Sequence, residues 1–207
     1  MAETIAIVDY GLGNLCSVAG AVECLGFSPV ITADKGALGA ADKIILPGVG
    51  AFGDGMKKLH DRGLVEILDA LVRGDRKPIL GICLGCQLFA RKSYEFGEHE
   101  GLGWVDAEVC RITPADPELR VPHVGWNDLI ALREGILLQT LPQPATVYYV
   151  HSFQVVFRDP MPVTAVTEYG GSIVAAYESE NIFATQFHPE KSQQHGLTIL
   201  RNFLEKA

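Results

Sequence analysis

The sequence predicts an α/β fold: a mostly parallel central sheet flanked by helices, with antiparallel strands added in the C-terminal half. Two observations predict it. In the first half, short apolar segments rich in β-branched residues alternate with segments whose apolar residues recur near every 3.6 positions. This alternation is typical of parallel strands joined by crossover helices. In the second half, short strand-like segments follow one another between Gly, Pro and Asp residues, which is typical of antiparallel hairpins.

In the first half, strands and helices are expected to alternate along the chain. A strand-like run over residues 4–9 is followed by Gly11 and Gly13, which turn the chain into a helix over 14–25, and Gly26 ends that helix. The remaining elements expected here are strands over 29–32, 43–46 and 78–82, one or two helices over 56–73 interrupted near Gly63, and a helix over 84–92.

The second half contains five strand candidates and one closing helix. The strands are expected over 104–112, 146–150, 163–168, 173–177 and 182–186, and the helix over 197–206. No internal repeat and no linker divides the chain, so we expect residues 1–207 to form a single domain.

The composition of the chain limits the classes of protein to which it can belong. The 207 residues carry 17 Lys and Arg against 25 Asp and Glu, a net charge of −8, and 48% of them are apolar. Such a chain is expected to bury a core, and an acidic chain without a basic run is a poor match for nucleic acid or an anionic membrane. The N-terminus does not resemble a signal peptide, and the five cysteines are an odd count without disulfide-scaffold density. We therefore expect a cytoplasmic protein with reduced thiols.

The sharpest local feature is the run GICLG at residues 81–85, between a predicted strand and a predicted helix. A nucleophile on such a turn has a strained backbone, and flanking glycines leave room for it. The helix N-terminus favours the thiolate of Cys83, and the N–H of Leu84 points at the oxyanion formed by attack on a carbonyl. The alternative is a buried cysteine at a glycine-flanked turn.

Two further segments complete a constellation. A cysteine nucleophile needs a base with an orienting group, and His188 and Glu190 in the run QFHPE supply both side-chain types. The loop PGVGAF over residues 47–52 follows a strand and exposes backbone amides where open α/β sheets bind ligands. The alternatives, for each segment taken singly, are a histidine satisfied in a loop with Glu190 as a solvated charge, and a simple turn over residues 47–52.

Together these residues carry a resemblance to the class I glutamine amidotransferases, most closely to the branch of glutaminase subunits of imidazole glycerol phosphate synthase. Six segments match in the family's order: DYGLGNL at 9–15, PGVGAF at 47–52, GICLGCQ at 81–87, PHVGWN at 122–127, YVHSF at 149–153 and FHPEKS at 187–192. The match covers nearly the whole chain. The turn GICLG at residues 81–85 together with His-Pro-Glu at 188–190 is specific to the class.

The resemblance implies residue roles. Cys83 is expected to be the nucleophile, His188 the general base and acid, and Glu190 the residue that orients it. The expected oxyanion hole is Leu84 with an amide of the Val49–Gly50 loop, and the expected substrate-binding residues are Gln87, Ser152 and Phe153. The mechanism implied is hydrolysis of glutamine to glutamate and ammonia through a cysteine thioester, which needs no metal and no organic cofactor.

The resemblance also implies a partner. Enzymes of this branch pass ammonia to a (β/α)8-barrel cyclase subunit of the HisF type, for imidazole glycerol phosphate synthesis in histidine biosynthesis. Asn14, Trp126 and Lys191 match positions that face this partner. Their alternatives are a helix N-cap, a core tryptophan and a surface charge. No nucleic-acid or membrane partner is expected.

One position departs from the family, which usually has methionine where this chain has Cys86. The resulting C-x-x-C spacing is also found in dithiol redox motifs, so a reversible Cys83–Cys86 disulfide is one alternative. A zinc deaminase is another, although in deaminases the His-x-Glu motif precedes the C-x-x-C motif and here it follows. Gly11-x-Gly13 after the first strand resembles the start of the dinucleotide-binding motif G-x-G-x-x-G, with Asp34 as the acidic residue that would bind the ribose. The third glycine of that motif is missing here. Two alternatives for the function also stay open. One is a paralogue that supplies ammonia to a sugar-amidating synthase, and the other is a non-catalytic interaction module that keeps a vestigial triad.

Overall fold

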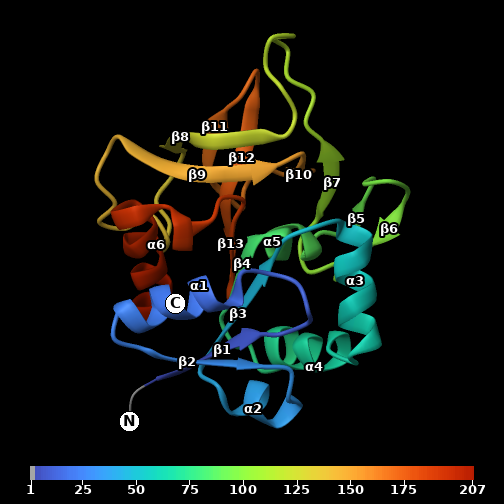
Figure 1. Ribbon diagram of the computed structural model, residues 1–207, viewed down its shortest axis with the longest axis vertical. Helices are drawn as coiled ribbons and strands as arrows, with labels where there is room; N and C mark the ends of the chain where they lie inside the picture. The colour runs from blue at the N-terminus through green and yellow to red at the C-terminus, as the bar shows by residue number, and fades with distance from the viewer. Residues whose placement is uncertain (1–2) are drawn as a thin grey trace.

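A nine-stranded sheet forms the centre of the protein in the computed structural model, which describes residues 3–207 (Figure 1). In sheet order its strands are β2 (Ser28–Thr32), β1 (Thr4–Val8), β3 (Lys43–Gly48), β4 (Ile79–Cys83), β13 (Ile182–Thr185), β12 (Ser172–Ser179), β11 (Val163–Glu168), β8 (His123–Ala131) and β9 (Ala145–His151). The first five are parallel to one another, and the remaining pairings are antiparallel. The predicted fold class is confirmed.

A second, smaller sheet and seven helical segments complete the structure. The sheet has the order β10 (Phe153–Phe157), β7 (Ala107–Arg111), β5 (Lys92–Ser93) and β6 (His99–Glu100). The helices are α1 (Leu15–Cys24), α2 (Lys35–Ala40), α3 (Phe52–Asp61), α4 (Val65–Asp69) continuing into a π-helical turn (Ala70–Gly74), α5 (Leu84–Leu88), a 3₁₀ turn (Pro189–Lys191) and α6 (Gln193–Lys206). Among the described residues, no helix combines the length and apolar character needed to cross a bilayer.

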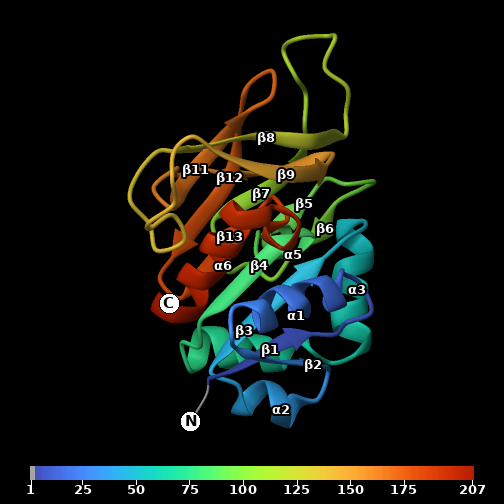
Figure 2. The same ribbon diagram turned by 60° about the vertical axis from the view of Figure 1, so that its left-hand side comes forward.

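Helices cover both faces of the parallel strands. α1 and α6 lie on the same side of the sheet (Figure 2) and supply apolar side chains to one core cluster, whereas α2, α3, α4 and α5 supply the other. Along β1 the side chains of Ile5 and Ile7 enter the first cluster, and those of Ala6 and Val8 enter the second. Strands buried on both faces read as continuous apolar runs. β1, β3, β4 and β13 are buried in this way, which explains their apolar runs, whereas β2 at the edge of the sheet is mostly exposed.

The helix predicted over residues 84–92 is wrong in its second half. α5 ends at Leu88, and residues 92–93 form β5 instead. The carbonyl of Leu88 accepts the N–H of Leu102, and that of Phe89 accepts the N–H of Trp104, at 2.9 Å each. These acceptors are therefore taken by a segment distant in the chain, which no local pattern reveals. The strand predicted over 104–112 is correspondingly shorter, Ala107–Arg111.

Three elements of at least five residues were not predicted: α2, β8 and β10. Asp34 is the N-cap of α2 and accepts the N–H of Ala37 at 2.8 Å. Asp34 thus caps a helix, and the dinucleotide interpretation loses its candidate ribose acid. β8 alternates buried and exposed residues only in part and contains Gly125 with φ +131°, so its pattern resembles a loop.

Candidate active site

The candidate site residues lie at the carboxyl ends of three adjacent parallel strands, β3, β4 and β13. Gly48 at the end of β3 is the register partner of Cys83 at the end of β4. Val49 and Gly50, which follow Gly48 in the chain, therefore lie next to Cys83. β13 pairs with the other side of β4, and the chain that leaves it carries His188. Open α/β sheets bind ligands at the carboxyl ends of their strands.

Cys83 has the backbone geometry predicted for a nucleophile on a strand-to-helix turn. Its φ is +54° and its ψ is −108°, a region that L residues adopt at a cost of about 1–3 kcal/mol. The glycines around it are sterically required: a Cβ at Gly81 would lie 2.6 Å from the Phe89 ring, and one at Gly85 would overlap the backbone oxygen of Leu46. A tightly packed turn therefore holds Cys83 in this conformation.

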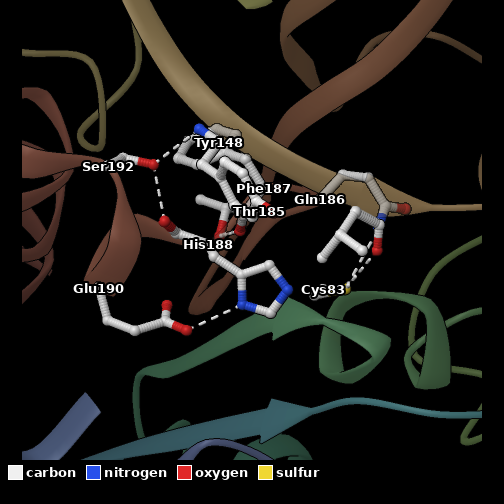
Figure 3. Close-up of polar contacts among 9 residues, drawn as sticks. Cys83, Tyr148, Thr185, Gln186, Phe187, His188, Glu190 and Ser192 are labelled. Carbon is white, nitrogen blue, oxygen red and sulfur yellow. Dashed lines mark hydrogen bonds and ion pairs between the residues drawn. The ribbon is translucent and has the colours of Figure 1, made fainter. Parts of the chain in front are cut away.

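His188 and Glu190 form a buried pair opposite the sulfur. Nδ1 of His188 lies 2.8 Å from Oε1 of Glu190, and since a carboxylate only accepts, Nδ1 carries the hydrogen. The side chains are 2% and 1% exposed. The turn is fixed by Ser192, whose hydroxyl donates to the His188 carbonyl at 2.6 Å and accepts the N–H of Tyr148 at 3.0 Å (Figure 3).

The other imidazole nitrogen of His188 is directed toward Cys83. Figure 3 shows the ring between the Glu190 carboxylate and the sulfur, and Nε2 is buried without a hydrogen-bond partner among the described residues. Burial by itself lowers the pKa of His188, but Cys83 and Glu190 outweigh burial and raise it to about 9. The imidazole therefore holds a proton at neutral pH and can transfer it at Nε2.

A pocket of about 460 Å³ opens in front of Cys83. Eight residues proposed from the sequence line it: Val49, Gly50, Cys83, Leu84, Gln87, Ser152, Phe153 and Lys191. Four lining residues were not proposed: Glu95, Pro122, Val150 and His151. Residues far apart in the chain thus converge on one cavity that can hold a small molecule.

Glu95 is the most informative of the four. Its side chain is buried, it accepts the N–H of Phe52 at 2.7 Å, and burial raises the pKa of its carboxyl despite that hydrogen bond. A carboxylate at the wall of a pocket suits a cationic group of a ligand. Glu95 begins the run EFGEHE at residues 95–100, but the sequence does not distinguish it from Glu98, which is exposed.

A buried histidine pair supports the wall formed by Ser152 and Phe153. The carbonyl of Phe153 accepts hydrogen bonds from Gln87 Nε2 at 3.0 Å and from His151 Nδ1 at 2.9 Å. Nδ1 of His123 lies 3.1 Å from Nε2 of His151. Burial lowers the pKa of both histidines to about 4, so both are neutral at physiological pH. Both histidines lie in segments that match the family, 122–127 and 149–153, but the sequence analysis did not predict their contact.

The three residues expected to face a partner lie at the surface or at the pocket. Asn14 is the N-cap residue of α1, as its alternative has it, although its side chain makes no capping hydrogen bond. Trp126 is 49% exposed, so the core alternative for this residue is wrong. Lys191 lines the pocket with its Nζ 5.9 Å from the centre of the Tyr148 ring.

The five cysteines are free thiols, including Cys83 and Cys86. Burial raises the pKa of Cys86 well above its ordinary value, and the neighbouring Cys83 adds to this rise. A thiol that stays protonated is a poor partner for disulfide exchange. The Cys83–Cys86 disulfide stays a prediction. Across residues 3–207, no group of three or more His, Cys, Asp or Glu side chains is arranged to hold a metal ion.

The family model for class I glutamine amidotransferases matches residues 6–207. The structure of PurLQS from Thermotoga maritima has the same fold, with a TM-score of 0.74 at 23% identity over 99% of this chain and 98% of that one. The chain therefore belongs to the class I glutamine amidotransferases, and it is an enzyme of that class.

Full-length relatives narrow the assignment. Imidazole glycerol phosphate synthase subunit HisH 2 of Nitrobacter winogradskyi is 44% identical over 206 residues, covering 97% of each chain. Subunit HisH of Aquifex aeolicus is 46% identical over 202 residues, covering 97% of this chain and 96% of its own. Within the class, the chain belongs with the HisH glutaminase subunits, the branch that the sequence motifs indicated.

Proposed function

We propose that this chain hydrolyses glutamine through a thioester on Cys83 and passes the ammonia to a (β/α)8-barrel cyclase subunit, as part of imidazole glycerol phosphate synthesis in histidine biosynthesis. One observation carries the proposal: a strained cysteine at a pocket faces a buried His188–Glu190 pair. The decisive test is glutamate release from glutamine by the complex with the cyclase, with and without the thiol at position 83.

The reaction begins with attack of the Cys83 sulfur on the side-chain amide carbon of glutamine. The electron pair of the carbonyl moves to its oxygen, which becomes an oxyanion. The N–H of Leu84 and an amide of the 49–50 loop border the same pocket and stabilise this charge. Each such donor contributes about 2.7–4 kcal/mol where one has been removed from an enzyme.

Collapse of the tetrahedral intermediate requires a proton on the leaving nitrogen. His188 gives its Nε2 proton to this nitrogen, the C–N bond breaks, and ammonia leaves a thioester on Cys83. The neutral imidazole then takes a proton from water, whose oxygen attacks the thioester, and glutamate departs while the thiol group is restored. Glu190 holds the ring in place through both steps.

The α-amino and α-carboxylate groups of glutamine are expected to meet Glu95 and the backbone of residues 152–153. Glu95 offers a carboxylate for the α-ammonium group, and the backbone of Ser152 and Phe153 offers hydrogen-bond donors and acceptors. Both hydrogens of Gln87 Nε2 are used within the protein, one on Phe153 and one on Gln186. Gln87 therefore has only its oxygen left for the substrate, and binds a hydrogen-bond donor of it.

The activity is expected to fall as the pH rises through about 9, because His188 then loses the proton that the leaving nitrogen needs. In Glu190→Gln this alkaline limb moves to lower pH, since a contact that raises the pKa of His188 is lost, and kcat falls roughly 10²–10⁴-fold. The measurement is the pH profile of glutamate release by both complexes. An unchanged alkaline midpoint in Glu190→Gln contradicts the role given to this carboxylate.

An exposed apolar surface beside the pocket suits the cyclase. Val124 and Trp126 of β8 are 54% and 49% exposed, and their register partners on β9 are Val150 and Tyr148. Val150 also lines the pocket. A partner seated here closes the route by which ammonia meets bulk water. Protonation in water abolishes the nucleophilicity of ammonia, so a sealed interface has a chemical purpose.

Trp126→Ala is expected to weaken binding of the cyclase roughly 30-fold or more, because exposed tryptophans at interfaces commonly contribute at least 2 kcal/mol. The control is Ile31→Ala, which removes a side chain 41% exposed on β2, at the opposite edge of the sheet. Titration calorimetry with the cyclase measures both. Equal dissociation constants for the two variants and the wild type rule out this surface.

A further inference from the structure

Gln186 is a buried carboxamide that the mechanism above does not use. It follows β13 directly, stands two residues before His188 and is 2% exposed. A buried amide is costly unless it is hydrogen-bonded. Its side-chain partners are Cys83, Cys86 and Gln87, which all belong to the strand-to-helix turn or to α5. The carboxamide therefore connects the residue that carries the nucleophile with α5.

The direction of this carboxamide is fixed by the hydrogen bonds around it. Gln87 must present its nitrogen to the carbonyl of Phe153, 3.0 Å away, because a carbonyl only accepts. The same nitrogen lies 3.0 Å from Oε1 of Gln186. Gln186 consequently turns its oxygen to Gln87 and its N–H group to Cys83, where Nε2 lies 3.9 Å from the sulfur (Figure 3).

Cys86 strengthens this orientation. Its sulfur lies 3.9 Å from Oε1 of Gln186, and burial raises its pKa, so it keeps the hydrogen that it donates to that oxygen. The oxygen of Gln186 is then occupied by two donors. A methionine at position 86 would have no such hydrogen to donate.

We propose that Gln186 is a positioning residue of the glutaminase reaction, holding the Cys83 thiolate with its N–H and the Gln87 carboxamide with its oxygen. The proposal rests on the function proposed above. The N–H of Gln186 donates to the sulfur, and this hydrogen bond stabilises the negative charge that the sulfur carries when it attacks the substrate. The same amide sets the orientation of Gln87 toward the substrate. One buried side chain thereby couples the nucleophile to substrate binding.

Gln186→Met tests both proposed contacts of Gln186, the one with the Cys83 sulfur and the one with the Gln87 carboxamide. Methionine fills a similar volume but has neither a donor N–H nor a carbonyl oxygen. In the isolated chain, alkylation of Cys83 by iodoacetamide at pH 7.5, followed by mass spectrometry of the Cys83 peptide, is expected to slow about tenfold. In the complex with the cyclase, kcat is expected to fall about tenfold and KM for glutamine to rise about fivefold. The matched control is Gln139→Met, at an exposed position between β8 and β9, with unchanged values.

A second variant keeps the proposal testable if Gln186→Met does not fold. Gln87→Met frees the oxygen of Gln186, so Cys83 alkylation is expected to slow about threefold although Gln87 makes no hydrogen bond to the sulfur. Alkylation within twofold of the wild type in folded Gln186→Met, or failing that in Gln87→Met, overturns the proposal. Loss of the proposed function itself has a different signature, namely glutamine hydrolysis that persists in Cys83→Ala.

Discussion

Cys83→Ala is expected to abolish glutamine-dependent activity, with kcat for glutamate release reduced roughly 10⁴–10⁶-fold. Alanine cannot form the thioester, and the pocket offers no second nucleophile in a strained turn facing His188. The substitution only removes a sulfur atom from a side chain that is 6% exposed, so the fold is expected to persist. The measurement is glutamate release by the complex with the cyclase under saturating glutamine.

Two controls separate lost chemistry from lost structure. The complex containing Cys83→Ala is expected to keep wild-type synthase activity when ammonium salt replaces glutamine, because the cyclase then needs no glutaminase. Cys24→Ala, which removes an exposed thiol at the end of α1, is expected to leave both activities unchanged. Glutamate release by Cys83→Ala at the wild-type rate refutes the thioester mechanism.

The residues proposed from the sequence are those whose chemistry depends on a short stretch of chain. Cys83 was recognisable because the strand, the two glycines and the helix around it are contiguous, and the strained φ follows from that local arrangement. His188 and Glu190 were recognisable because two residues of spacing suffice to bring a carboxylate to Nδ1. Their approach to the sulfur was inferred from the resemblance and not from the spacing.

The groups that the sequence did not indicate depend on contacts between distant segments. Glu95 reaches the pocket because the loop after β5 meets the start of α3, where Phe52 donates its N–H. The pairing of His123 with His151 arises from the register of β8 with β9. Gln186 lies within a motif that the sequence did single out, but its role depends on amide directions set by Phe153. Such relationships have no local pattern to reveal them.

Gly85→Ala is expected to be the most destabilising of the substitutions considered for the turn, lowering the free energy of unfolding by more than about 4 kcal/mol. The added Cβ would overlap the backbone oxygen of Leu46, which belongs to β3. That oxygen cannot move away freely, because β3 is paired with β1 on one side and with β4 on the other. The measurement is urea unfolding of the isolated chain.

The matched control is Gly20→Ala in α1, where an added Cβ meets nothing within 4 Å. Glycine inside a helix costs about 0.5–1 kcal/mol relative to alanine, so this variant is expected to be more stable than the wild type. The two variants make the same chemical change with opposite expected signs. Any Gly85→Ala that folds must shift α5 away from β3, and this displaces Cys83 from its partners. Residual glutaminase activity is therefore expected to fall at least about 10²-fold, and a folded Gly85→Ala with wild-type activity contradicts the close packing of this turn.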